Sequence, residues 1–124
     1  MGFLTSRFWW LPIGSVPEVT AKELQIELAK TRNKPNLLDV RTLNEWKQGA
    51  IKNSVLLPVN LLPRQVGSLQ FDKDQPVVAV CRSATRSIGA VRLLKAAGYT
   101  NVRHLQGGMI AWQNANFPTI VPKD

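Results

Sequence analysis

Cys81, the only cysteine in the chain, stands where an apolar run meets a short polar loop. The run VVAV (77–80) precedes it, and Arg82 and Arg86 follow within five positions. A loop that turns sharply between a strand and a helix can point several backbone N–H groups at one spot and bind an anion there. The positive end of the following helix and the two guanidinium groups add to the same field. The residue types therefore predict a thiolate nucleophile beside an anion-binding site, because a thiolate attacks without a separate base.

The other interpretation of Cys81 is a small thiol buried in the core, as is common for free cysteine. The arginines then become surface charge, and Ser83, Thr85 and Ser87 become ordinary turn and cap residues. Stabilisation of a thiolate by the groups around it is energetically feasible. A helix terminus contributes roughly 0.3–1 kcal/mol, and each hydrogen bond to a charged group contributes roughly 1.5–3 kcal/mol. We therefore favour the nucleophile, and expect Arg86 to fold back over the anion site.

The elements that must position Cys81 alternate between helix and strand. Helices are predicted at 19–30, 42–49, 60–66, 87–98 and 106–115, and strands at 36–40, 53–59, 77–81 and 101–105. Thr20 and Glu23 form a capping-box pattern at the first helix. This alternation predicts an α/β fold with a central parallel sheet flanked by helices on both faces. Ligands of such sheets bind beyond the carboxyl ends of the strands, which is where Cys81 stands.

The composition limits the remaining possibilities. The 124 residues have the size of one domain, and 16 Lys and Arg against 8 Asp and Glu give a net charge of +8. One cysteine excludes an internal disulfide, and together with the single histidine, His104, it cannot fill a four-ligand zinc shell without carboxylates, so no zinc site is expected. His104 is interpreted as a packing or surface residue of a short strand. The basic residues are spread from Arg7 to Lys123 without a dense run, so no specific nucleic-acid binding is expected.

Residues 1–15 are predicted to be an apolar extension and residues 16–124 the domain. The large apolar side chains of the extension are Phe3, Leu4, Phe8, Trp9 and Trp10. We expect the segment Phe3–Trp10 to cover part of the domain or to mediate association with a partner or a second copy, because an apolar patch in water needs a cover. No apolar run reaches the roughly 18 residues of a membrane span, and the N-terminus lacks the features of a secretory signal. A cytoplasmic location is expected.

Four stretches, in this order, resemble the single-domain rhodanese family of the thiosulfate sulfurtransferase type. They are LLDVRTLNEWKQGAIKNSVLLP, VVAVCRSATRS, the helix end AAGYTNV, and LQGGMIAWQNANFP. The resemblance extends from about Val19 to Pro118. It implies a three-layer rhodanese-like fold in which the active cysteine follows a central strand.

The resemblance also implies a reaction, with Cys81 as the catalytic residue. The thiolate takes a sulfane sulfur from thiosulfate or a related anionic donor, becomes a persulfide, and passes the sulfur to cyanide or a thiol. No cofactor and no metal is implied. The implied substrate-binding residues are Arg82, Ser83, Ala84, Thr85 and Arg86. The implied structural support of the site consists of Asp39, Arg41, Gly107 and Gly108, with Asp39 and Arg41 as a buried polar pair behind the active loop. Helical spacing also lets Arg41 pair with Glu45.

Two other functions stay open. The first is phosphatase or arsenate-reductase chemistry. Phosphatases of the rhodanese type have five residues between cysteine and arginine, a wider loop that admits phosphate or arsenate. Here Arg82 to Thr85 make four, and the tighter ring suits one sulfur atom better than a tetrahedral oxyanion. A non-catalytic interaction domain is the second alternative, against which the retained cysteine and arginines argue.

Two positions depart from the family pattern. Ala50 stands where many relatives have histidine, so any orienting role of that histidine is lost, and Ala84 stands where many have glycine. If position 84 needs a positive φ, alanine costs roughly 1 kcal/mol there.

Overall fold

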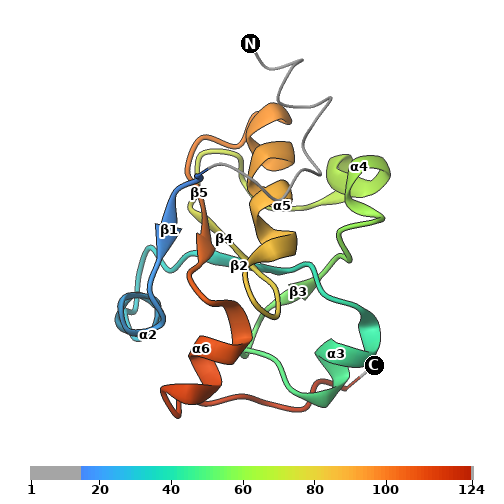
Figure 1. The fold of residues 1–124 in the computed structure, drawn as a ribbon. Coiled ribbons are helices and arrows are strands. Elements are labelled where there is room, and N and C mark those ends of the chain that lie inside the picture. Colours follow the sequence, from blue (N-terminus) through green and yellow to red (C-terminus); the bar gives the residue numbers. More distant parts are fainter. Residues whose placement is uncertain (1–14, 124) are drawn as a thin grey trace.

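A five-stranded parallel sheet forms the centre of the protein (Figure 1). In this computed structural model the described residues are 15–123, so the predicted extension lies outside them apart from Ser15. The elements in chain order are β1 (Glu18–Val19), α2 (Ala21–Leu28), β2 (Asn36–Asp39), α3 (Leu43–Gln48), β3 (Val55–Leu56), α4 (Leu62–Gln65), the 3₁₀ turn η1 (Val66–Ser68), β4 (Val77–Val80), α5 (Thr85–Ala96), β5 (Val102–Leu105) and α6 (Gly108–Asn114). The strands lie in the order β1-β5-β4-β2-β3.

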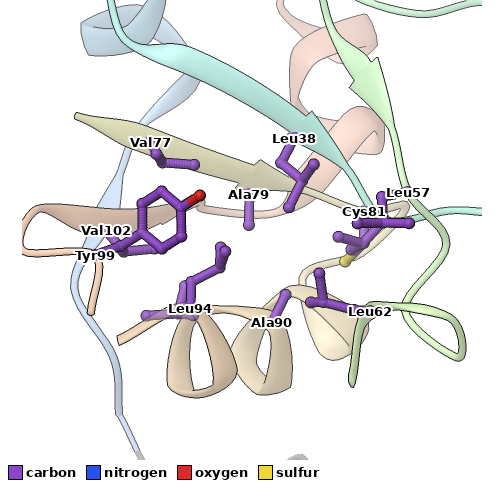
Figure 2. Packing of buried hydrophobic residues seen from close by; sticks show 12 residues of the cluster. Leu38, Leu57, Leu62, Val77, Ala79, Cys81, Ala90, Leu94, Tyr99 and Val102 are labelled. Carbon is purple, nitrogen blue, oxygen red and sulfur yellow. The ribbon is translucent and has the colours of Figure 1, made fainter. Parts of the chain in front are cut away.

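Helices cover both faces of this sheet, which confirms the expected three-layer α/β fold (Figure 1). On one face, α4 and α5 pack through Leu62, Ala90 and Leu94 onto the strands (Figure 2). On the other face, α2 and α6 pack through Leu24 and Trp112. The two apolar clusters arise because β4 is buried on both faces, as a continuous apolar run in a central parallel strand requires.

The register of β2 and β4 brings the two segments that follow them to the same edge of the sheet. Asp39 pairs with Val80, and the N–H of Val40 donates to the Val80 carbonyl at 2.9 Å. Arg41 therefore leaves β2 at the edge where Cys81 leaves β4. This is the carboxyl edge at which parallel α/β sheets build their sites.

Local sequence explains where the helices begin. Thr20 and Glu23 form the expected capping box of α2, and Thr42 and Glu45 form a second one at α3. Helix α5 begins at Thr85, two residues earlier than predicted, because Ala84 takes a left-handed conformation, with φ +78°, and turns the chain directly into the helix.

The differences from the predicted elements lie in the short strands. The segment 53–59 yields only β3, because Asn53 has φ +69° before it and Pro58, after it, has no N–H to donate. Strand β1 was not expected, since two residues are too few to show an alternating pattern; it pairs Glu18 with His104 of β5.

Candidate active site

Cys81 lies one residue beyond the end of β4 and its thiol is buried beneath the loop. Its exposed fraction is only 1%, and it belongs to the apolar cluster that also contains Leu57 and Leu62 (Figure 2). The S–H donates to the Ser87 hydroxyl oxygen at 3.4 Å. Ser87 is in the first turn of α5, so the thiol faces the positive end of that helix. The thiol is thus buried, and it lies under the loop and the helix start that the nucleophile prediction requires.

The loop residues predicted to bind substrate lie above this thiol with different exposures. Arg82, Ser83 and Thr85 are exposed, and Ala84 is half-buried. Position 84 has the positive φ on which the alanine penalty depends. Alanine there is strained where glycine would not be.

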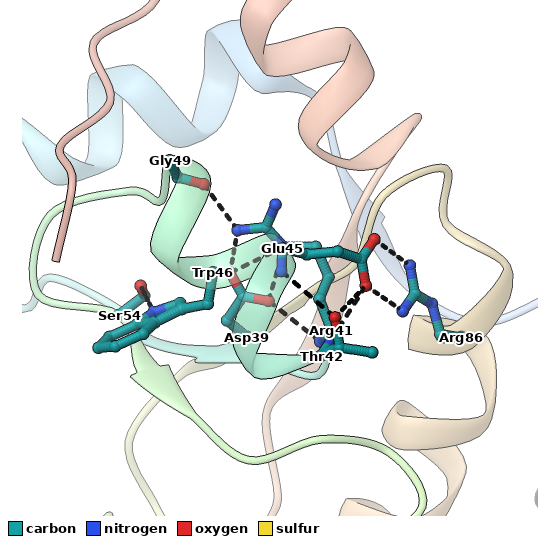
Figure 3. A network of polar contacts seen from close by, with 8 residues as sticks. All are labelled: Asp39, Arg41, Thr42, Glu45, Trp46, Gly49, Ser54 and Arg86. Atoms are coloured by element: carbon teal, nitrogen blue, oxygen red, sulfur yellow. Dashed lines mark hydrogen bonds and ion pairs between the residues drawn. The ribbon is translucent and has the colours of Figure 1, made fainter. Parts of the chain in front are cut away.

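Arg86 is held by Glu45 and does not extend freely over the loop. Its Nη1 and Nη2 donate to the two oxygens of the Glu45 carboxylate at 2.6 and 2.8 Å, which joins α5 to α3 (Figure 3). These bonds to Arg86 are the main reason that the pKa of Glu45 falls to about 2. The same carboxylate also accepts the N–H of Thr42 at 3.0 Å. The sequence did not indicate that Glu45 is the partner of Arg86, because the two residues are 41 positions apart.

Asp39 and Arg41 form a buried ion pair behind the loop (Figure 3). Arg41 donates from Nε and Nη2 to both carboxylate oxygens, at 2.7 Å in the shortest contact, and from Nη2 to the Gly49 carbonyl at 2.9 Å. This is the buried polar pair that the family resemblance implied. Arg41 binds Asp39 at the end of β2 and not Glu45, whose carboxylate binds Arg86. The pair fastens the β2–α3 connection to the carboxyl edge of the sheet.

The glycine pair Gly107-Gly108 brings the start of α6 against the cysteine loop. Both glycines have positive φ, +72° and +59°. A side chain at Gly108 would collide with the Cys81 carbonyl oxygen and come within 2.5 Å of the Arg82 carbonyl oxygen. The same two carbonyls accept the N–H groups of Met109, at 2.8 Å, and Ile110, at 3.0 Å. These contacts hold the β4–α5 loop against the first turn of α6.

A hollow of about 240 Å³ opens beside this loop. Its walls are Arg41, Glu45, Gln48, Gly49, Arg82, Met109, Ile110 and Gln113. Two of the predicted site residues, Arg41 and Arg82, line it together with Glu45, and it has room for a small anion or the end of a thiol. A larger hollow of about 550 Å³, between residues such as Lys34, Phe71 and Trp112, contains none of the predicted site residues.

His104 is buried behind the thiol, with 4% of its surface exposed, and is not a surface residue. Its Nδ1 lies 2.9 Å from the Ser87 hydroxyl and its Nε2 lies 3.3 Å from the Glu18 carboxylate. Burial lowers the pKa of His104 below its ordinary 6.5, while Glu18 opposes this effect. No motif in the sequence links these three residues, because the contacts depend on the register of β1 with β5.

The part of the chain that the structure describes contains no group of Cys, His, Asp and Glu suited to a metal ion. No helix in residues 15–123 is long and apolar enough to cross a membrane.

The parallel sheet, with helices on both faces and a cysteine loop after its central strand, is the architecture of the rhodanese-like class. The family model of the rhodanese-like domain matches residues 20–115. The chain therefore belongs to the rhodanese-like domain family, as the sequence resemblance indicated.

Individual relatives agree with this assignment. The chain is 37% identical to a protein of Allochromatium vinosum named "Sulfurtransferase", with 87% of this chain and 98% of that protein covered. It is 34% identical to the probable adenylyltransferase/sulfurtransferase MoeZ of Mycobacterium tuberculosis over 83% of this chain but 26% of that protein, so domains of this kind also occur within larger proteins. Among solved structures, a rhodanese-related protein of Thermoplasma volcanium superposes with a TM-score of 0.76 at 25% identity, covering 86% of this chain and all of that one.

Proposed function

We propose that the protein is a sulfurtransferase that carries a sulfane sulfur on Cys81 as a persulfide. The donor is thiosulfate or a related anionic persulfide, and the acceptor is a thiol or cyanide. The observation that carries the proposal is the position of Cys81, at the carboxyl end of β4 and under the start of α5, in a chain of the rhodanese-like family. The similarity to a protein named sulfurtransferase supports the reaction class.

In the first half of the reaction, the Cys81 thiolate attacks the outer sulfur of the donor. A bond forms between Sγ and that sulfur, and the sulfur–sulfur bond of thiosulfate breaks. Both electrons of the broken bond leave with sulfite, and Cys81 becomes a persulfide. Charge on the sulfur is stabilised by the positive end of α5 and by any N–H of the loop that points at it.

In the second half, the acceptor attacks the outer sulfur of the persulfide. Cyanide becomes thiocyanate, or a thiolate becomes a persulfide, and Cys81 returns to the thiolate. Sulfur moves without a net change in the oxidation state of Cys81, so the cycle needs neither cofactor nor metal.

Arg82 is the loop cation that this proposal assigns to the donor. Arg86 already uses both terminal nitrogens on Glu45, whereas Arg82 is exposed and lines the hollow beside the loop. Arg86 then acts as a support that fixes the first turn of α5. Ser83, Ala84 and Thr85 supply backbone to the cradle around the outer sulfur.

Sulfur loading followed by intact-mass measurement tests the proposal. The purified protein is incubated with thiosulfate, glutathione persulfide and polysulfide in turn, and the expected result is a gain of one sulfur atom that a thiol removes. Cys81→Ser should gain none. A native protein that gains no sulfur from any of the three donors contradicts the proposal.

The same samples separate the two alternatives. Turnover of an aryl phosphate or of arsenate, without sulfur loading, identifies the phosphatase or reductase chemistry. Failure of Cys81 to load sulfur, together with failure to alkylate at neutral pH, identifies a non-catalytic interaction domain.

A further inference from the structure

A line of hydrogen-bonding groups runs from the buried thiol to the protein surface. The S–H of Cys81 donates to Oγ of Ser87 at 3.4 Å, and that oxygen lies 2.9 Å from Nδ1 of His104. On the far side of the ring, Nε2 lies 3.3 Å from Oε2 of Glu18, whose side chain is 48% exposed. We call this line the Cys–Ser–His–Glu relay. Cys81, Ser87 and His104 are all buried, so the relay connects a thiol that has no direct contact with water to a carboxylate that is in contact with water.

Four elements hold the relay: β1, β4, β5 and α5. Strand register places Glu18 of β1 opposite His104 of β5, on the face that α5 covers. The register of β4 and β5 pairs His104 with Ala79, two residues before Cys81, so the thiol and the ring share that face. Ser87 reaches both from the first turn of α5. Near the outer end of the relay, Glu18 lines a hollow together with Glu23, Glu27 and Arg103, and its Oε1 accepts the side-chain N–H of Gln106 at 3.2 Å. Near the thiol, the charged group is Arg86, whose pKa is raised chiefly by Glu45 and in smaller part by Cys81.

The carboxylate of Glu18 determines which ring nitrogen carries the proton. With His104 neutral, Nε2–H donates to Glu18 and Nδ1 is left as an acceptor. The pKa of His104, lowered by burial, keeps the ring neutral at pH 7. The Ser87 hydroxyl then donates to Nδ1 and accepts the S–H, although the Ala84 carbonyl at 3.1 Å offers the hydroxyl a second acceptor.

We propose that His104 takes up, through Ser87, the proton that Cys81 loses when it becomes a nucleophile, and that Glu18 stabilises the resulting imidazolium; this inference rests on the proposed function for its role in turnover. The thiol proton passes to Ser87 Oγ as the hydroxyl proton passes to Nδ1. The hydroxyl keeps one proton, and the products are a Cys81 thiolate and a His104 imidazolium. In that state Nδ1–H donates to Ser87, the hydroxyl donates to the thiolate, and Nε2–H still donates to Glu18.

Every polar group of the relay thus has a partner both before and after the transfer. Burial, which disfavours either charge alone, is offset because the two charges form together and the imidazolium lies against Glu18. Ser87 is the relay residue that touches the reacting sulfur; His104 and Glu18 act through it as positioning residues.

Two readouts test the relay, one with a donor and one without. The first is the pH dependence of persulfide formation under single-turnover conditions. The wild-type rate should fall at acid pH, where His104 is already protonated and cannot accept. His104→Asn keeps a hydrogen bond to Ser87 but takes up no proton, so its rate at pH 7 should drop at least tenfold and the acid limb assigned to His104 should disappear. Ser87→Ala should do the same.

Glu18→Gln gives a directional check. Glu18 raises the pKa of His104, so removal of its charge should move the acid limb to lower pH. Asp74→Asn, which removes a carboxylate from an exposed turn outside the relay, should leave the profile unchanged. An acid limb at the same pH in a folded His104→Asn protein as in the wild type overturns the relay.

The second readout is the ultraviolet absorbance of the thiolate, which needs neither donor nor access to the thiol. Because the chain has one cysteine, the difference from Cys81→Ser reports this thiolate alone. The absorbance should appear at a pH higher by about one unit in Ser87→Ala, since a hydrogen bond to the charged form is lost, and in His104→Asn, since no imidazolium then stabilises the thiolate. Identical titrations overturn the relay, whether or not the protein accepts sulfur. Failure of sulfur loading with shifted titrations instead overturns the proposed function and leaves the relay supported.

Discussion

Glu45 binds Arg86 through two parallel hydrogen bonds across 41 positions of sequence, and through this pair α3 fixes the first turn of α5. The same carboxylate closes the capping box of α3 through Thr42 (Figure 3). The Glu45 side chain therefore fixes the start of α3 through Thr42, and it fixes the end of the cysteine loop through Arg86. The site depends on this contact for its shape more than for its charge, because both charges are already neutralised by each other.

This pair should stabilise the protein only at a pH where Glu45 is ionised. Its folded pKa of about 2 lies below the ordinary 4.5, so the stabilisation is complete above about pH 4.5 and is lost as the pH falls toward 2. Glu45→Gln should lower the free energy of unfolding by about 1–2 kcal/mol at pH 7, a value reduced by the partial exposure of both side chains. Urea unfolding at pH 7 and near pH 2 measures this. An equal loss at both pH values would argue that the charge is irrelevant.

Ala84→Gly should stabilise the protein by about 1 kcal/mol, because glycine removes the strain of a left-handed alanine. Ala96→Gly, at an exposed position of the same helix, should instead destabilise it by about 1 kcal/mol. Chemical unfolding of both variants beside the wild type measures these changes in the free energy of unfolding. Loss of stability in both would mean that the loop does not hold position 84 at positive φ.

Gly108→Ala should cost about 3 kcal/mol or displace the cysteine loop. The added methyl group meets the Cys81 and Arg82 carbonyl oxygens, and alanine is also strained at φ +59°. Gly67→Ala is the matched control, because nothing lies within 4 Å of its Cβ position. Thermal unfolding and sulfur loading of the two variants should differ sharply; equal behaviour would refute the close approach of α6.

Arg41→Met should destabilise the protein by about 3–5 kcal/mol, because it leaves the Asp39 carboxylate buried without its partner. The double variant Asp39→Leu/Arg41→Met should recover most of this loss, since no unpaired charge remains. The free energies of unfolding of the wild type, Arg41→Met and the double variant, measured in urea, show how much of the loss is recovered. A double variant less stable than Arg41→Met would assign the pair a role beyond mutual neutralisation.

Arg82→Ala should raise KM for an anionic donor about five- to tenfold and leave stability unchanged, because this side chain is exposed beside the hollow. Arg82→Lys should retain most of the affinity, and added salt should weaken the wild type more than Arg82→Ala. Steady-state kinetics with thiosulfate at two ionic strengths provide the comparison. A KM unaffected by Arg82→Ala would remove this residue from donor binding.

The sequence predicts the fold well because its strongest signals are local. The apolar run of β4, the capping box at Thr20 and the alternation of elements each depend on neighbouring residues. Those signals place Cys81 at the correct edge of the sheet before any contact is known. Short elements are the exception: β1 and β3, at the two edges of the sheet, are set by pairing and not by their own two residues.

The contacts around the site could not be predicted, because they depend on packing between distant segments. His104 looks like an ordinary strand residue until the register of β1 and β5 sets Glu18 beside it. Arg86 looks like a free cation until α3 brings Glu45 to it. Ala84 illustrates the opposite case, since its strain follows from the local need for a left-handed turn.

Because β4 is the middle strand of five, the amide hydrogens just before Cys81 are among those that exchange with solvent only when the whole sheet opens. The loop and first turn after it contact the sheet through a few identifiable bonds. Substitutions there can alter which molecules react with the sulfur while the slowest-exchanging part of the protein keeps its protection. Evolution and engineering can therefore change the chemistry of this protein at one end of β4 without disturbing its most cooperative unit.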